Sequence, residues 1–483
     1  MKTFKHFWSL LLLLLAMFVP QGAWAQYDGT PVTPAGSGTE DAPYQIASAA
    51  NLYWFANHVN NGNSPANAVL TANIVVNDTA NWKTWDNTTD TIHTWTPIDS
   101  YEGTFDGADH TISGLYCKEG NAALFSSTTN NATITNLGVT ASYFNGQFAA
   151  GGICEYNEGS ITNCYNSSTV IGETYAGGIC GNNFQGSITN CCNMGMVSAA
   201  NANGICGVNN SGDIKNCYNL IKNAEDNYEL ADGNLNLTDG SSFFSPVNFT
   251  VRGSVAYNRL ANKDTMTIIL PYDVPASDVN GQAYQLKSFD GQILKYEKVN
   301  DGLKANVPYL IYKKRNGVTN ELLVKPQSGI LIHATTSIDT VKVNGGKVIE
   351  FGAYKKEVFL SGDRSDEYDY YGYKGGKFLK AKQDITMSPF RVAIRLTKTA
   401  AGNTTRAFSL NNVSLNELNV VFDDNVTGVK VTNTTSELVG KVNVYDALGH
   451  AIRLNVDAEN CLDGLKDGVY VVNGKKIIVK SEK

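Results

Sequence analysis

The segment GGICEYNEGSITNCYN begins at Gly151, and two further copies of nearly the same text follow it. GGICGNNFQGSITNCCN begins at Gly177 and NGICGVNNSGDIKNCYN begins at Asn203, so successive copies start 26 residues apart. A fixed period of this length is typical of a solenoid, in which each repeat forms one coil stacked on the previous coil. The copies contain no helix-length apolar stripe, only short extended runs broken by Gly and Asn. The repeat therefore predicts a β-solenoid.

Weaker copies extend the repeat toward the N-terminus. Ile134-Thr135-Asn136-Leu137 stands 27 residues before Ile161-Thr162-Asn163-Cys164, which occupies the same place in its copy. We therefore expect an all-β chain that begins with a right-handed parallel β-helix over 26–222, with its clearest coils at 151–220.

One helix is predicted ahead of the coils. Ser48 is a suitable N-cap, and Asn61-Gly62 supplies a stop signal. The apolar residues between them follow the i, i+3, i+4, i+7 spacing of one helix face: Leu52, Phe55, Ala56 and Val59. The first coil of a solenoid exposes a sheet edge with unpaired backbone N–H and C=O groups. We therefore expect this helix to cover that edge as an N-terminal cap.

The rest of the chain divides into three further segments. Residues 223–244 are polar and rich in Asp and Asn, which predicts a linker. Residues 245–412 contain several short apolar runs separated by turn signals and predict a β-sandwich. Residues 418–483 predict a small C-terminal β-sandwich, in which Asn473-Gly474 lies between two alternating runs and indicates a two-residue hairpin.

The N-terminus indicates export. Lys2 and Lys5 precede the apolar run 7–19, and Ala23-Trp24-Ala25 forms an A-x-A cleavage site. This pattern predicts a signal peptide over 1–25, with Gln26 as the mature end. No other stretch is apolar for long enough to span a bilayer, so we expect no transmembrane segment in the mature chain.

Composition excludes one class of partner. The formal net charge is −7 and 17% of residues are charged, so no basic face is available for the phosphate contacts that dominate nucleic-acid binding. We therefore expect no nucleic-acid partner.

The repeat resembles a known family. Residues 177–197 resemble the GLUG repeat of bacterial surface proteins with parallel β-helical coils, and the segments 36–60 and 95–115 resemble the cap and first coils that often precede such repeats. The resemblance implies a surface protein with a β-helical body.

The tail resembles the type A C-terminal sorting domain of the Bacteroidetes type IX secretion system. The matching segments are Val442–Tyr445, Asp446–Gly449, Gly468–Val472 and Lys475–Lys480. One departure is His450, which stands where the family usually has Arg after the turn glycine. The resemblance implies passage across the outer membrane by the type IX machinery, through 418–483, to the cell surface or the medium.

Eight of the nine cysteines lie between Cys117 and Cys217. Stacking in register predicts one ladder of Cys154, Cys180 and Cys206, and another of Cys164, Cys191 (or Cys192) and Cys217. Many cysteines in an exported protein usually indicate disulfides. However, side chains stacked in register point in parallel, which suits a near-perpendicular disulfide dihedral poorly, and small thiols suit a narrow core. We therefore predict buried free thiols, with disulfides as the alternative, and no metal, because no CxxC pair occurs.

Asparagine recurs in the same way. Asn163, Asn190 and Asn216 occupy equivalent places and predict a ladder of stacked amides along the solenoid axis. We expect this ladder to be structural, with ligand recognition as the alternative.

Two clusters are candidates for chemistry. Asp106, Asp109 and His110 resemble an acid/base group, but Asp and Gly in this segment also predict a tight turn, which we favour. A second cluster offers four aromatic side chains as weak candidates for ligand binding, with an ordinary sandwich strand as the alternative: Tyr368, Tyr370, Tyr371 and Tyr373. No HExxH, GxSxG or phosphate-loop pattern occurs, so we expect neither catalysis nor a cofactor.

These expectations combine into one prediction. The chain is a non-catalytic cell-surface or secreted protein, an adhesin or a binder of glycan or host protein. Two alternatives remain open: a β-helix enzyme that acts on polysaccharide, and a structural component of the surface. The sequence does not identify the ligand.

Overall fold

The structure is a computed structural model that describes residues 27–479 apart from several segments. Those segments are 88–91, 119, 292, 314–320, 360–367, 399–415, 424–440, 447–450, 458–460, 463–464, 466–467 and 473–474. The chain separates into two compact units, one up to Asp423 and one from Asp424 onward. The predicted signal peptide lies outside the described residues.

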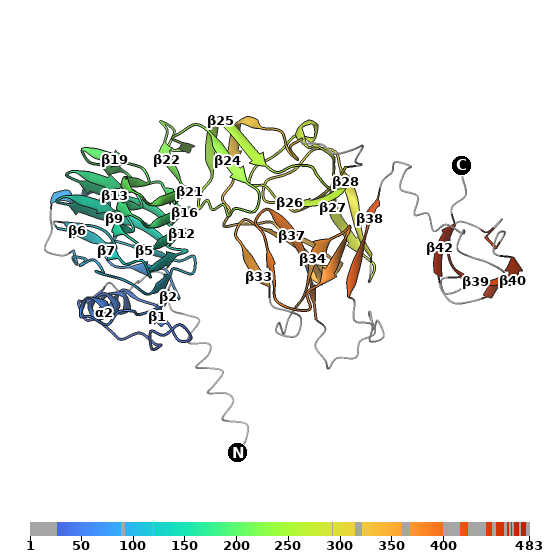
Figure 1. Cartoon of the computed structure of the whole chain (residues 1–483), viewed down its shortest axis with the longest axis horizontal. Coiled ribbons are helices and arrows are strands. Elements are labelled where there is room, and N and C mark those ends of the chain that lie inside the picture. Colours follow the sequence, from blue (N-terminus) through green and yellow to red (C-terminus); the bar gives the residue numbers. More distant parts are fainter. Residues whose placement is uncertain are drawn as a thin grey trace, which may run out of the picture. The chain divides into compact units, whose positions relative to one another are not determined.

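The first part of the larger unit is a β-solenoid of parallel strands, as the repeat predicts (Figure 1). One of its sheets takes one strand from each coil: β1 (Tyr44–Ile46), β2 (Ala68–Leu70), β4 (Thr104–Asp106), β8 (Thr133–Thr135), β12 (Ser160–Thr162), β16 (Ser187–Thr189) and β21 (Asp213–Lys215). In this sheet Ile161 pairs with Ile134 on one side and with Ile188 on the other. The 26- and 27-residue periods of the sequence are therefore the perimeters of successive coils.

Three further sheets complete the coils. One contains β7 (Phe125–Thr128), β11 (Cys154–Asn157), β15 (Cys180–Phe184) and β20 (Cys206–Asn210), and a second contains β10 (Ala149–Gly151), β14 (Tyr175–Gly177) and β19 (Asn201–Asn203). The third runs through β3 (Ile74–Val75), β5 (Thr111–Ser113), β9 (Gly138–Gly146), β13 (Tyr165–Gly172), β17 (Cys192–Asn193) and β22 (Tyr218–Lys222), with β6 (Tyr116–Lys118) and β18 (Val197–Ser198) at its side.

The predicted helix is present as α2 (Ala49–Asn60), and Ser48 caps it by accepting a hydrogen bond from the backbone N–H of Asn51. Its apolar face is buried and Phe55 packs against Tyr101 and Phe105 of the early coils. The helix thus joins the solenoid core. Its role as a cover for the first sheet edge stays a prediction.

The sheet that contains β22 continues beyond the solenoid. It adds β23 (Tyr228–Leu230), β25 (Phe249–Asn258) and β24 (Leu235–Thr238), and β30 (Gln327–Ile332) pairs with β25. Residues 223–244, which we interpreted as a linker, therefore contain two strands. The reason is the alternation of buried Leu235 and Leu237 with exposed Asn236, which seats β24 against β25 despite the polar composition.

A curled sheet of ten strands fills the remainder of the larger unit, and its neighbouring strands run antiparallel except at one parallel pair. Its order is β26 (Thr265–Ile268), β29 (Tyr309–Tyr312), β27 (Gln282–Phe289), β28 (Ile293–Val299), β38 (Glu417–Asp423), β35 (Lys377–Lys380), β34 (Tyr368–Lys374), β37 (Arg391–Thr397), β32 (Val348–Ala353) and β31 (Val341–Val343). β33 (Glu357–Phe359) and β36 (Ile385–Met387) form a separate pair. Short 3-10 helices lie at Ala276–Asp278 and Asn344–Gly346 in this region, and at Trp82–Asn87 in the solenoid. β31 contacts β27, although the two strands lie far apart in this order. This contact shows that the sheet curls.

The C-terminal unit is a four-stranded antiparallel sheet. Its order is β40 (Ala451–Asp457), β39 (Lys441–Asp446), β41 (Gly468–Val472) and β42 (Lys475–Val479). β41 and β42 pair up to Val472 and Lys475, as the hairpin prediction requires, while Asn473-Gly474 and His450 lie outside the described residues. The unit begins after β38, whereas we had placed its start at residue 418, because β38 pairs with β28 and β35.

Among the described residues, no helix has the length and hydrophobicity required to cross a membrane.

Candidate functional site

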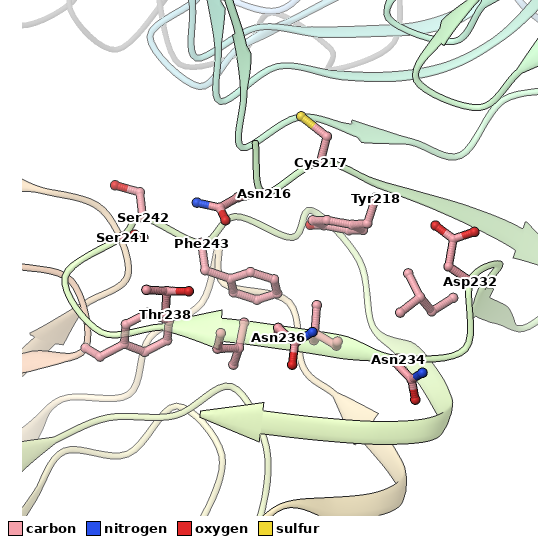
Figure 2. A pocket seen from close by; sticks show the side chains of 14 residues that line it. Asn216, Cys217, Tyr218, Asp232, Asn234, Asn236, Thr238, Ser241, Ser242 and Phe243 are labelled. Carbon is pink, nitrogen blue, oxygen red and sulfur yellow. The ribbon is translucent and has the colours of Figure 1, made fainter. Parts of the chain in front are cut away.

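A cavity of about 220 Å³ opens where the last coil of the solenoid meets β24. Figure 2 shows Asn216 and Cys217 on one side of it, and Asn234, Asn236 and Thr238 on the other. The cavity exists because the coil stack stops here. Beyond Asn216 and Cys217 no further coil follows, and the chain turns through β22 and β23 into the extended sheet.

Aromatic side chains form the apolar part of the lining. Tyr218, Phe243 and Phe390 all line the cavity and are 5%, 4% and 0% exposed. The Tyr218 ring stacks on Phe243 with centroids 5.8 Å apart, and its hydroxyl donates to the Phe244 carbonyl. These contacts fix the rings before any ligand arrives.

An ion pair holds Phe390 in place. The neighbouring Arg391 donates to both carboxylate oxygens of Asp239, at 2.5 and 2.8 Å, in the bidentate geometry that guanidinium and carboxylate favour. Burial opposes ionisation of Asp239, but the hydrogen bonds and charge of Arg391 outweigh it and lower the pKa of Asp239. The pair therefore joins β37 to the segment that follows β24.

Several polar side chains at the cavity are free to bind. Within the part of the chain that the structure describes, Asn216, Asp232 and Asn236 have no hydrogen-bond partner for their side chains, whereas Asn234 accepts from the Ser254 N–H at 2.7 Å. The site thus combines amide and carboxylate groups with aromatic rings, and none of the described residues that line it is Lys or Arg.

The predicted asparagine ladder leads into this cavity. Asn163 donates to the Asn136 side-chain oxygen at 3.0 Å, and Asn190 donates to that of Asn163 at 3.3 Å. All four asparagines of this corner adopt a left-handed backbone, which Asn tolerates better than most residues: Asn136, Asn163, Asn190 and Asn216, at φ 52°, 55°, 54° and 51°. The amide of Asn216 does not continue the ladder, because the buried Asn190 Oδ1 has no partner.

The two cysteine ladders occur in the predicted positions. Cys180 pairs in register with Cys154 and Cys206. In the second ladder Cys191, rather than Cys192, joins Cys164 and Cys217, since its backbone N–H donates to the Cys217 sulfur at 3.4 Å. Cys192 instead lies in register with Tyr165 and Tyr218. That the thiols are free stays a prediction.

Two further asparagine ladders were not predicted, and both are more deeply buried. Asn157 donates to Asn183 and Asn183 to Asn209, each at 2.8 Å. The other ladder joins Asn166, Asn193 and Asn219 at 2.9 and 2.8 Å. The sequence could have predicted both ladders, because these asparagines recur with the same period as the cysteines.

The tyrosine cluster does not form one surface. Successive side chains of β34 point to opposite faces. Tyr371 is 1% exposed and packs in one core, and Tyr373 packs against Phe378 on the same side. Tyr368 and Tyr370 lie on the other face, where the Arg395 guanidinium is 4.7 Å from the Tyr368 ring. These residues are thus mainly structural.

The cluster of Asp106, Asp109 and His110 is a turn. Asp106 accepts from the Ala108 N–H at 2.9 Å, and both Ala108 and Asp109 have a left-handed backbone. Asp109 forms an ion pair of 2.6 Å with Lys355. Asp106 therefore stabilises a turn, and Asp109 joins this turn to Lys355, which lies 246 residues further along the chain.

A different carboxyl pair lies on the solenoid. Burial, with a smaller contribution from the charge of Asp99, raises the pKa of Glu155 to about 7. Asp99 accepts from the hydroxyls of Ser126 and Ser127 at 2.8 Å each. Burial opposes its ionisation, but these hydrogen bonds outweigh that effect and lower the pKa of Asp99. Among the described residues, no group of three or more His, Cys, Asp or Glu could hold a metal ion.

Comparisons with known proteins add little. No protein-family profile and no curated protein matches the chain. A solved structure that resembles part of it is that of a "putative immunoglobulin A1 protease" from Bacteroides ovatus, at 19% identity and a TM-score of 0.30, covering 47% of this chain and 71% of that chain. A similarity of this strength carries no argument about function.

Proposed function

We propose that the chain is an exported, non-catalytic protein of the cell surface or medium that binds glycan through the cavity at the end of the solenoid. The observation that carries this proposal is the combination of unpartnered amide and carboxylate groups, on Asn216, Asp232 and Asn236, with buried aromatic rings. The hydroxyl groups of a sugar can hydrogen-bond to the amide and carboxylate groups, and its C–H faces can pack on the aromatic rings. The volume of the cavity suits one sugar unit rather than a protein surface. A host protein would therefore be bound through a glycan that it carries.

The repeats and the tail support the same proposal. The GLUG-like coils fit a surface protein, and the C-terminal unit fits a type IX sorting domain. After removal of the signal peptide, the sorting domain would engage the secretion machinery and leave the protein at the outer-membrane surface or in the medium. The protein would act there as an adhesin.

An array experiment tests the binding proposal. The mature protein is applied to broad glycan and extracellular-matrix arrays, beside the variants Asn216→Ala and Asn236→Ala. Each variant should weaken binding about fivefold, since a hydrogen bond to a ligand contributes on the order of 1 kcal/mol. Asn227→Ala is the matched control, because Asn227 is also exposed but lies outside the cavity. Undiminished binding by both cavity variants would place the site elsewhere, and no binding to any glycan would refute the proposal.

A truncation tests the sorting proposal. Ending the chain after Asp423 removes the C-terminal unit and leaves the curled sheet complete. In the native bacterium the truncated protein should accumulate in the periplasm, while the purified protein should bind the same glycans as the full chain. Surface display without the tail would contradict the assignment.

The carboxyl pair favours a second candidate, an enzyme that hydrolyses polysaccharide. Glycoside hydrolysis needs one protonated and one ionised carboxyl group, and the environments of Glu155 and Asp99 separate their pKa values in that sense. Hydrolysis assays run beside the arrays distinguish the candidates. Activity that Glu155→Gln abolishes would favour the enzyme, and absence of hydrolysis of bound glycans would favour the binder.

A further inference from the structure

The cavity at the end of the solenoid carries one unpaired charge. Asp232 is the only Asp, Glu, Lys or Arg among the described residues that line it. Asp232 is exposed, and its carboxylate has no hydrogen-bond or ion-pair partner among the described residues. Figure 2 shows Asp232 at one end of the lining, and Ser241 and Ser242 at the opposite end. The two ends of the cavity therefore differ in charge.

A second carboxylate, next to the lining, is already neutralised. Asp239 follows Thr238, which lines the cavity, but both of its oxygens accept hydrogen bonds from Arg391, at 2.5 and 2.8 Å. Burial opposes ionisation of Asp239, but the hydrogen bonds and charge of Arg391, and then the charge of Arg259, lower its pKa. Neither arginine lines the cavity. Negative charge is therefore free only at the Asp232 end.

The rest of the lining is uncharged and suits sugars of any charge. The rings of Tyr218 and Phe243 offer an apolar face, and the side-chain amides of Asn216 and Asn236 have no partner among the described residues. An amide can both donate to and accept from a sugar hydroxyl, so it does not discriminate between charged and neutral sugars. Discrimination by charge therefore depends on Asp232.

We propose that the sugar unit bound in this cavity is an amino sugar, whose protonated amino group pairs with Asp232, and that acidic sugars are rejected. This inference rests on the proposed glycan binding and adds the charge of the ligand to it. An ammonium group donates hydrogen bonds that a carboxylate accepts. A carboxylate or sulfate group on a sugar would instead lie beside a like charge, with no Lys or Arg in the described lining to offset the repulsion.

The preference should be modest and sensitive to salt, because Asp232 is exposed. An exposed ion pair changes an affinity by up to about fivefold. Dissolved salt screens such a pair. The measurement therefore belongs at low ionic strength, and the preference should shrink as salt is added.

The experiment uses three tetrasaccharides with the same β-1,4-linked glucose-type backbone. One consists of glucosamine, one of N-acetylglucosamine and one of glucuronic acid, so that they differ in charge. Titration calorimetry of the mature protein at about pH 5.5 keeps ordinary carboxylates ionised and the amino groups protonated. The glucosamine compound should bind about fivefold more tightly than the N-acetylated one, and the glucuronic acid compound about fivefold more weakly than the N-acetylated one. Asp232→Asn should bring the three affinities to within about twofold of each other.

Glu225→Gln is the matched control. Glu225 is exposed in the turn between β22 and β23 and does not line the cavity. This variant removes the same unit of charge as Asp232→Asn, so it should preserve the order of the three affinities if that order comes from the cavity rather than from the net charge of the protein. Near-UV circular dichroism confirms that each variant is folded.

Four results would overturn the proposal: equal affinities, tightest binding of the glucuronic acid compound, an order that persists in Asp232→Asn, or no binding of any of the three. The glycan proposal fails on different results. It depends on the loss of affinity in Asn216→Ala and Asn236→Ala for whichever glycan binds, and not on the order of the three tetrasaccharides.

Discussion

The solenoid and the curled sheet are built from strands of similar length by opposite rules. In the solenoid each residue pairs with its equivalent in the next coil, as Ile161 does with Ile188. In the curled sheet the pairings follow no period. Some strands pair with the next one, as β27 does with β28, and others pair with a distant one, as when Ile293 of β28 pairs with Asn419 of β38. The first region is held by contacts between neighbouring coils that repeat with the period, and the second by hairpins and long-range pairs that each occur once.

The two regions also bury polar groups differently. The solenoid buries amides in chains, where Asn183 both accepts from Asn157 and donates to Asn209. The curled sheet buries Glu350 beside the Tyr296 hydroxyl, which donates to it at 2.6 Å, and its second carboxylate oxygen has no hydrogen-bond partner among the described residues. Repetition therefore lets a polar group become part of the core, whereas an isolated polar group in a core remains a source of strain.

The largest effect should come from breaking the period itself. Deleting residues 177–202 removes one whole coil and joins Ala176 to Asn203, which already pairs in register with Gly177. This variant should fold to a shorter solenoid with a cooperative melt. Deleting only 177–189 should abolish cooperative unfolding, because every later residue loses its equivalent. Circular dichroism melts compare the two, and identical behaviour would contradict the modular interpretation.

Removing one asparagine from a buried amide ladder should have the next largest effect. Asn183→Ala leaves the Asn157 amide and the Gly186 carbonyl without their partner, and should lower the free energy of unfolding by about 3 to 5 kcal/mol. Asn227→Ala, at an exposed position, should change it by less than about 0.5 kcal/mol. Urea titration measures both, and an effect below about 1 kcal/mol for Asn183→Ala would show that the ladder contributes little.

The cysteine ladder should respond more weakly than the buried amides. Cys180→Ser places a poorly paired hydroxyl in the core and should destabilise by roughly 1 to 3 kcal/mol. Cys217→Ser should cost less, because residue 217 is only partly buried. Thiols counted after denaturation without reductant test the redox state. A count of two or fewer would show that the ladders are bridged.

The effect with the smallest change at each step, about 1 kcal/mol per pH unit, is specific to the curled sheet and concerns pH. Burial raises the pKa of Glu350 to about 8 from its usual 4.5. The folded chain then keeps a proton that the unfolded chain releases, so the free energy of unfolding should fall between about pH 5 and pH 8, by about 1 kcal/mol per pH unit, and then level off. Glu350→Gln should remove that slope. Glu155 stays in both proteins and cancels from the difference, so an unchanged slope in Glu350→Gln would refute the assignment.

The sequence predicts the solenoid far better than the cavity, and the reason is physical. A period specifies which residues share a ladder, as with Cys154, Cys180 and Cys206. It does not specify which side of a strand faces inward, so Asn157 and Asn166 were not recognised as core residues. It also could not decide between the adjacent Cys191 and Cys192, since only the strand register distinguishes them.

The cavity depends on contacts that no local pattern reveals. Its lining combines the last coil with β24, which the polar composition of 223–244 concealed, and with Phe390 from the curled sheet. The sequence predicted Asn216 and Cys217 only as ladder members. That they mark the point where the ladders stop, and so become available, follows from the tertiary structure.

The amide ladders also make the solenoid an assembly of oriented dipoles. In the Asn157 and Asn166 ladders each amide donates toward the next coil, whereas in the Asn136 ladder each donates toward the previous one. The amide dipoles of the Asn157 and Asn166 ladders thus point opposite to those of the Asn136 ladder. The net electric field along the solenoid axis is therefore smaller than it would be if all three ladders were parallel. Reversing a single amide would break the bonds on both sides of it, so each row keeps one polarity along its length. The Asn136 row therefore ends in the side-chain oxygen of Asn190, which is buried one coil before the last and has no hydrogen-bond partner among the described residues.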